Sequence, residues 1–291
     1  MHFAGVFLGV TLAQLHEPAH LRQLSPLYED NVQRVVKQHG PASLEAADAA
    51  LIAAQFLHAA GQTIVARRYA EQSLAARESS AAHEWLATLA PENALAHLER
   101  AIALHAQPSV SLARLHTRLA GWYDAHRAPK PALDEYRAAV SVYEKLGRAE
   151  EAALAVALND LGLALENQSP PGFAEAERLY RRALVIQERK LGARQVDTGI
   201  TLNNLAGALG ARGRFAEAEP LLRRALAVLD ATLGPESLKS ANCASNLGDL
   251  LTARGGAQAE VQALYRRALK VFEAAGDLEA ITRLKALVTA K

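Results

Sequence analysis

The sequence has few of the residues that disulfide, metal or membrane architectures need. It contains one cysteine, Cys243, in 291 residues, which excludes an intramolecular disulfide framework and a zinc site built from several cysteines. No stretch approaches the ~20 consecutive apolar residues of a membrane-spanning helix. The 32 basic and 31 acidic residues nearly cancel, so no whole-molecule field attracts nucleic acid or an anionic membrane. We therefore expect neither a nucleic-acid partner nor a membrane span.

Aromatic residues are also scarce, at 5% of a chain that is 50% hydrophobic. Alanine and leucine supply most of the apolar side chains, which suits closely packed helices better than sheets rich in β-branched and aromatic residues. The composition therefore predicts an all-α protein.

The sequence repeats itself with a period of 42 residues. The segment FAEAERLYRRAL at 173–184 returns as FAEAEPLLRRAL at 215–226, and its second half returns at 263–269 as ALYRRAL. Such self-similarity is typical of stacked units that bury their apolar faces only against neighbours. We expect an α-solenoid, a right-handed superhelix of about six antiparallel helix pairs closed by a C-terminal capping helix.

The chain divides into an apolar N-terminal segment, residues 1–25, and a repeat domain, residues 26–291. Hydrophobic periodicity and Gly/Pro turn signals predict a shortened, less regular helix pair around Pro91, near 85–89 and 94–104. The other expected helices are 26–39, 43–60, 64–77, 109–125, 131–146, 149–167, 173–190, 196–212, 216–232, 238–254, 258–275 and 277–288.

The apolar run at residues 1–14 has the length of a secretory signal, with Ala13 placed at a small-residue cleavage site. No lysine or arginine precedes the run, so an apolar first helix docked on the solenoid is the alternative. Export to the periplasm or beyond is favoured over a cytoplasmic location.

The repeat resembles the tetratricopeptide family. Leu202, Leu205 and Leu209 follow the spacing of a helix packing face, while the small residues Ala206 and Ala218 allow two antiparallel helices to approach closely. Further small residues that fit the signature are Gly213, Ala225, Ala183 and Ala176. The period and the Leu-Asn-Asn-Leu-Ala motif resemble the kinesin-light-chain type of repeat, over about residues 27–275.

This resemblance implies a concave groove, lined by the first helix of each pair, that binds a peptide or partner protein. Asn159, Asn203 and Gly207 are expected on that side, where amides can donate to and accept from an extended backbone. For Asn204 and Asn246 we expect hydrogen bonds to turn backbone within their own repeats.

Two arginines, Arg114 and Arg118, lie one turn apart on a first helix and are further candidates for the groove. They resemble part of the site with which chaperone-binding members of the family hold a terminal carboxylate, but the companion Lys and Asn are absent. An acidic side chain is a suitable ligand for them. The recurrent pairs Arg181-Arg182, Arg223-Arg224 and Arg266-Arg267 follow glutamates on the same helices, which predicts mutual neutralisation.

Catalytic and metal-binding signals are weak, and we expect no catalytic residue, no metal ligand and no cofactor. His16 and His20 have zincin spacing around a glutamate, but Pro18 would disturb the helix that must hold both imidazoles. The function predicted is a non-catalytic interaction scaffold. Two alternatives remain: a metal-dependent hydrolase that uses the histidine-rich N-terminal third, or a regulatory arm of a larger complex.

Overall fold

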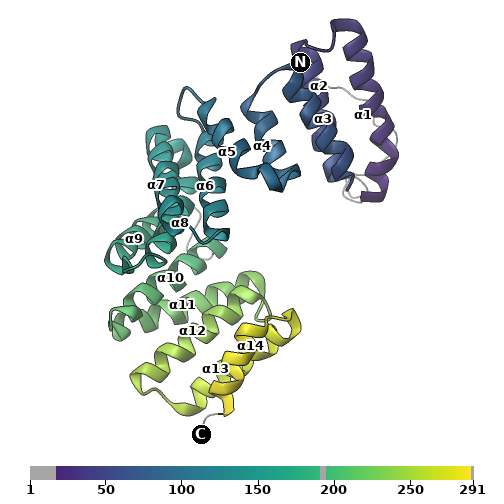
Figure 1. Ribbon diagram of the computed structural model, residues 1–291. Coiled ribbons are helices and arrows are strands. Elements are labelled where there is room, and N and C mark those ends of the chain that lie inside the picture. The colour runs from purple at the N-terminus through teal and green to yellow at the C-terminus, as the bar shows by residue number, and fades with distance from the viewer. Residues whose placement is uncertain (1–17, 191–194, 290–291) are drawn as a thin grey trace. The chain divides into compact units, whose positions relative to one another are not determined.

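The computed structural model describes residues 18–190 and 195–289, and all regular structure in them is helical (Figure 1). The predicted all-α class, with helices in sequential antiparallel pairs, is confirmed. In order, the helices are α1 (Pro18–His39), α2 (Leu44–Ala59), α3 (Thr63–Ala76), α4 (Ser80–Leu89), η2 (Pro91–Asn93), α5 (Ala94–Ala103), α6 (Val110–Ala125), α7 (Pro129–Leu146), η3 (Gly147–Glu150), α8 (Glu151–Glu166), α9 (Phe173–Lys190), α10 (Val196–Ala211), α11 (Phe215–Leu233), α12 (Leu238–Arg254), α13 (Gln258–Ala275) and α14 (Leu278–Thr289).

The chain forms two compact units, residues 1–107 and 108–291. In the first unit, α1 packs on α2 and each later helix packs on the one before it, through α5. Its core consists mainly of alanines from α2 and α3 together with Val32, Leu57 and Tyr69. The short pair α4 and α5, separated by η2 at Pro91, confirms the shortened pair predicted there.

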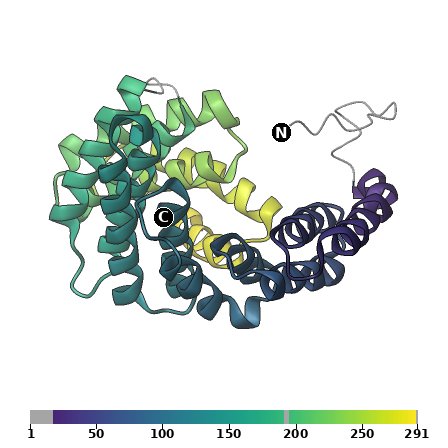
Figure 2. The same cartoon turned by 90° about the horizontal axis from the view of Figure 1, so that it is seen from above.

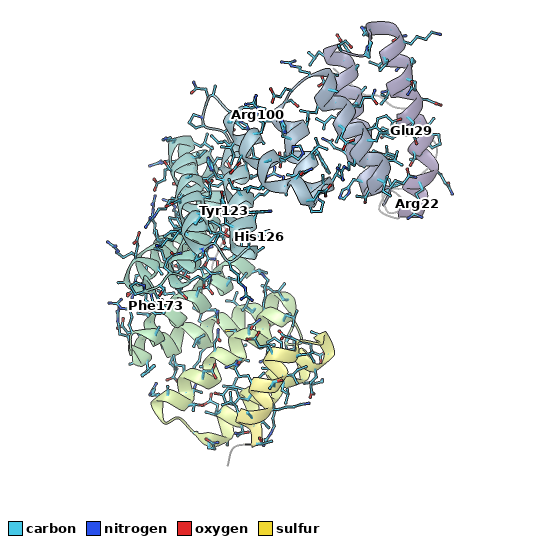
Figure 3. All side chains as sticks on the ribbon, viewed as in Figure 1. Arg22, Glu29, Arg100, Tyr123, His126 and Phe173 are labelled. Atoms are coloured by element: carbon cyan, nitrogen blue, oxygen red, sulfur yellow. The ribbon has the colours of Figure 1, made fainter. Side chains whose placement is uncertain are left out.

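Helix α1 begins at Pro18, upstream of the predicted start at Pro26, and continues through that proline. Two tertiary hydrogen bonds hold it: Arg22 Nε donates to the Ala60 carbonyl oxygen at 3.1 Å, and Tyr69 Oη donates to Glu29 Oε2 at 3.3 Å (Figure 3). These contacts fix α1 on both sides of the ring, although proline removes a helical donor. The predicted boundary at residue 26 therefore falls inside α1.

The second unit stacks four helix pairs, α6/α7, α8/α9, α10/α11 and α12/α13, and ends with α14 against α13. Each second helix also packs on the first helix of the next pair. Successive pairs of this unit follow one another around an arc, from teal to yellow in Figure 2.

The predicted segment at residues 1–14, including the cleavage site, lies outside the described residues.

The alanines that the repeat pattern predicts at helix contacts are buried in the core. The five that were singled out are at most 1% exposed: Ala176, Ala183, Ala206, Ala218 and Ala225. A methyl side chain lets helix axes approach, and leucines such as Leu205 and Leu222 fill the remaining space. The local pattern of small and bulky residues thus accounts for the packing within each pair.

Two first helices carry a glycine opposite a tyrosine of the second helix. A Cβ added to Gly162 would lie 2.5 Å from Tyr180 Cε1, and one added to Gly248 would lie 2.6 Å from Tyr265 Cε1. In the helix pair between these two, α10/α11, the equivalent positions are occupied by Ala206 and Leu222. A larger residue on one helix therefore accompanies a smaller one on the other, which keeps the packed volume nearly constant.

Candidate binding face

Three of the first helices of the second unit, α8, α10 and α12, lie in direct contact. Consecutive first helices contact each other directly, α8 with α10 and α10 with α12, and among the described residues no contact of that extent joins consecutive second helices. A stack whose first helices approach more closely than its second helices curves towards the first helices. We call the accessible surface of α6, α8, α10 and α12 the first-helix face.

The structure places all five predicted site residues on these helices, with different exposure. Arg114 and Gly207 are exposed, Arg118 and Asn203 are half-buried, and Asn159 is only 9% exposed. The two arginines lie on α6, whereas Asn203 and Gly207 lie one turn apart on α10. These residues spread over three helices and do not form one cluster.

A chain of side-chain amides links α12, α10 and α8. Asn246 Nδ2 donates to Asn203 Oδ1 at 3.0 Å, and Asn203 Nδ2 donates to Asn204 Oδ1 at 3.2 Å. Asn204 Nδ2 then donates to Asn159 Oδ1 at 3.1 Å. The chain of amides ends at Asn159, which also accepts a hydrogen bond from Thr201 Oγ1 at 3.3 Å.

This amide chain corrects one prediction and adds to another. Asn204 and Asn246 bond to asparagines of the preceding repeat and not to turn backbone within their own. The expectation considered only local partners, whereas stacking brings residues more than 40 positions apart, Asn204 and Asn159, within hydrogen-bond distance. For Asn159 and Asn203 the binding role remains a prediction, and both already join repeats together.

A hollow lies at the α6 end of the first-helix face. Arg114 and Arg118 line it from α6, Tyr143 from α7, and Val156 and Asp160 from α8. Val156 is 42% exposed, which is unusual for a valine in a packed helix pair. Burial raises the pKa of Asp160, the nearby Asp197 raises it further, and the hydrogen bond from Asn159 opposes the rise. The hollow therefore combines an apolar floor with both signs of charge.

A second hollow lies between α10 and α12. Its apolar wall is formed by Phe215, Leu222 and Leu250, and its polar groups are Asn246 and Asp249. Gly207 and Gly210 open it, and a Cβ added to Gly207 would meet no atom within 4 Å. Asn246 Oδ1, the acceptor end of the amide chain, receives no donor from the described residues. This hollow can thus accept a side chain and one hydrogen bond.

The second helices carry ion pairs both within a helix and from repeat to repeat. The predicted pairing within a helix is confirmed for Arg181 with Glu177 and Arg223 with Glu219, at 3.0 and 2.9 Å. The sequence did not predict the pairs that join repeats: Arg182 with Glu144, Arg224 with Glu188, Arg223 with Glu260 and Arg267 with Asp230. This surface largely neutralises itself.

The remaining candidates are the histidines and the cysteine considered for metal binding or catalysis. Within residues 18–190 and 195–289, no group of three His, Cys, Asp or Glu side chains could hold a metal ion. His16 and the side chain of His20 lie outside the described residues. Cys243 is fully buried in the core, and burial raises the pKa of its thiol to about 12. None of the described helices has the length and apolar character to cross a membrane.

Sequence comparison identifies the repeats. The family model described as tetratricopeptide repeat matches residues 153–231 and 197–274. No curated protein sequence matches the chain. Outside those ranges, evidence for the fold comes from solved structures.

Three solved structures illustrate the similarity. The Cut9-Hcn1 hetero-tetramer of the APC/C is 15% identical, with a TM-score of 0.60, 96% of this chain and 49% of that chain covered. YrrB, described as a TPR protein with an unusual peptide-binding site, is 14% identical, with a TM-score of 0.52, 69% of this chain and 94% of that chain covered. A kinesin light chain protein of Podosopora anserina with nearly identical TPR-like repeats is 19% identical, with a TM-score of 0.49, 89% of this chain and 98% of that chain covered.

These findings agree with the helix pairs, the small-residue contacts and the repeat period. The chain therefore contains tetratricopeptide repeats, matched over residues 153–274, and the fold that such repeats form generally serves as a scaffold for protein–protein interaction.

Proposed function

We propose that the chain is a non-catalytic scaffold that binds an extended segment of a partner protein along the first-helix face. The observation that carries the proposal is the opening at Gly207, where a hollow with an apolar wall adjoins the acceptor end of the amide chain. A peptide can place a side chain in such a hollow and donate a backbone N–H to Asn246 Oδ1. The fold is compatible with this role, because YrrB is described as having a peptide-binding site.

The two faces of the second unit differ in what they can offer a partner. Arginines and glutamates of the second helices already form ion pairs with each other. A ligand that has to break such pairs loses part of its binding free energy. On the first-helix face the hollows expose Val156 and the backbone at Gly207. At its α6 end, Arg114 and Arg118 line the other hollow, and both also interact with groups of the chain itself.

Gly207 offers a direct test, because a Cβ at this position meets no atom within 4 Å, so a longer side chain can extend from the backbone at the hollow without a clash at its base. The Gly207→Arg variant should fold normally and lose the partners that wild-type protein captures from its native host. Ala227→Arg is the matched control, since Ala227 is an exposed residue of the second helix α11. Quantitative mass spectrometry of affinity captures with the three proteins, each checked by circular dichroism, provides the measurement.

Partners lost from the Gly207→Arg capture and kept by Ala227→Arg support binding on the first-helix face. If folded Gly207→Arg captures the same proteins in the same amounts, the binding surface lies elsewhere. If both arginine variants lose the partners equally, added charge is the cause and the proposal fails.

A further inference from the structure

Two histidines meet between α4 and α5, in a region where sequence spacing gives no sign of a cluster. His83 Nδ1 lies 2.9 Å from His97 Nδ1. His83 is 8% exposed and packs between the two helices, with the imidazole ring centroids 5.2 Å apart. The residues are 14 positions apart and on different helices, so only the folded pair brings their nitrogens together.

The surroundings determine which nitrogen carries each proton. His83 Nε2 lies 3.4 Å from Glu78 Oε1, and Arg100 holds the same carboxylate with Nε at 2.6 Å and Nη2 at 2.8 Å (Arg100 is labelled in Figure 3). The hydrogen bonds from Arg100 lower the pKa of Glu78 to about 2, so this carboxylate only accepts. Neutral His83 therefore carries its proton on Nε2, and its Nδ1 accepts from His97 Nδ1–H.

This geometry tolerates one added proton but not two. If His83 gains a proton on Nδ1, neutral His97 can carry its own proton on Nε2, and its Nδ1 then accepts a hydrogen bond from His83 Nδ1–H. The carboxylate of Glu78 balances the charge on His83. If both rings are protonated, two N–H groups point at each other across 2.9 Å and two positive charges meet in a half-buried place. We propose that the His83–His97 pair is an acid-sensitive latch that holds α4 to α5 and releases when both imidazoles are protonated.

Charged groups on every packed element act on this pair. From α3, Arg67 lowers the pKa of His97 while Glu71 raises it, and Glu92 of η2 raises it as well. Arg67 itself is bound to both glutamates, at 2.9 and 2.5 Å. Burial is the largest cause of the lowered pKa of His97, and the positive charge on His83 is the next largest. Together with the other groups, they leave the pKa of His97 below its ordinary value.

The sign of the pH effect follows from this lowering. An unfolded or opened chain takes up the proton of His97 near the ordinary histidine pKa of about 6.5, whereas the closed pair excludes it until a lower pH. The latch is therefore unaffected above about pH 6.5 and weakens as the pH falls below that value. Because the opened chain then binds more protons than the closed pair, the opening constant rises as the pH falls, by at most about tenfold per pH unit.

Hydrogen exchange of the full chain between pH 7.5 and 5.5, corrected for intrinsic exchange rates, tests the latch. Backbone amides of α4 and α5 should lose up to about tenfold protection between pH 7.5 and 5.5, while amides of α10 and α11 keep theirs. The variant His97→Asn retains a neutral donor near the Nδ1 position and should lose this dependence. His39→Asn, which removes an exposed histidine of α1, should behave like the wild type.

Equal loss of protection in wild type and His97→Asn would overturn the proposal. Should His97→Asn fail to fold, the histidine ring signals of the wild type decide by NMR. One ring of the pair titrating well below the other supports the latch, and two independent titrations at ordinary pKa overturn it. Stoichiometric zinc binding at pH 7.5 that is lost in His97→Asn would make the pair a metal site and also overturn the proposal.

Discussion

Two glycines on first helices should respond in opposite ways to the same substitution. Gly162 of α8 and Gly207 of α10 both gain helix propensity when replaced by alanine, by about 1 kcal/mol. At Gly207 the new methyl group meets nothing within 4 Å, so this gain is the whole effect. At Gly162 the methyl group would lie 2.5 Å from Tyr180 Cε1 and 2.8 Å from Cζ, and Tyr180 is fully buried.

The ring of Tyr180 cannot move aside without disturbing the core around it. Overpacking of this kind costs about 1–3 kcal/mol. Since the propensity gain is common to both variants, Gly162→Ala should be less stable than Gly207→Ala by about 1–3 kcal/mol. In a unit of this size each kcal/mol changes the melting temperature by about 2–4 °C. Thermal unfolding followed by circular dichroism can resolve that difference.

The chain itself supplies the compensating change. In the next repeat Ala206 and Leu222 occupy the positions of Gly162 and Tyr180. Adding Tyr180→Leu to Gly162→Ala should therefore recover part of the lost stability by reproducing that combination. Equal melting temperatures for the two alanine variants, or no recovery in the double variant, would refute the argument from packed volume.

Two further predictions concern buried ionisable groups in the second unit. Burial alone would raise the pKa of Glu177, but hydrogen bonds from Arg181 and Arg214 outweigh it and lower the pKa. Its stabilising effect should thus be complete above the unfolded pKa of about 4.3 and disappear as the pH falls through the folded value. Glu177→Gln should cost about 1–3 kcal/mol in urea unfolding at pH 7, and the more exposed Glu188→Gln about 0–1 kcal/mol; equal costs would contradict this. The Cys243 thiol, with its raised pKa, should not react with a thiol reagent at pH 8 until the protein unfolds, and rapid labelling of native protein would show that the site opens.

Features that depend on nearby residues in the sequence could be predicted. The spacing of leucines and small residues gives the helix pairs, and Ala206 and Ala218 mark their close contacts, because both arise within one repeat. Glycine turns such as Gly61, with a φ of 76°, mark the ends of helices. Helix α1 was predicted too short because the hydrogen bond from Arg22 to a carbonyl 38 residues away has no local signal.

Contacts between repeats could not be predicted in the same way. The bond from Asn204 to Asn159 and the meeting of His83 with His97 depend on how one helix pair stacks on the next or folds on itself. Sequence shows that the polar residues exist but not which rotamer brings two of them together. Asn159 and Asn203 each accept a hydrogen bond from an asparagine of the following repeat, a contact that the expected binding role did not take into account.

The contacts between repeats explain how a chain without a single central core remains cohesive. In a solenoid, each repeat is stabilised by its own packing and by the interfaces with its neighbours. Here one side of the stack is joined by ion pairs such as Arg182 with Glu144, and α12, α10 and α8 are joined on the other side by the uncharged amides from Asn246 to Asn159. Salt weakens the ion pairs but hardly affects the bonds between neutral amides. The amide bonds across the first-helix face therefore persist over a range of ionic strength, as the proposed binding surface requires.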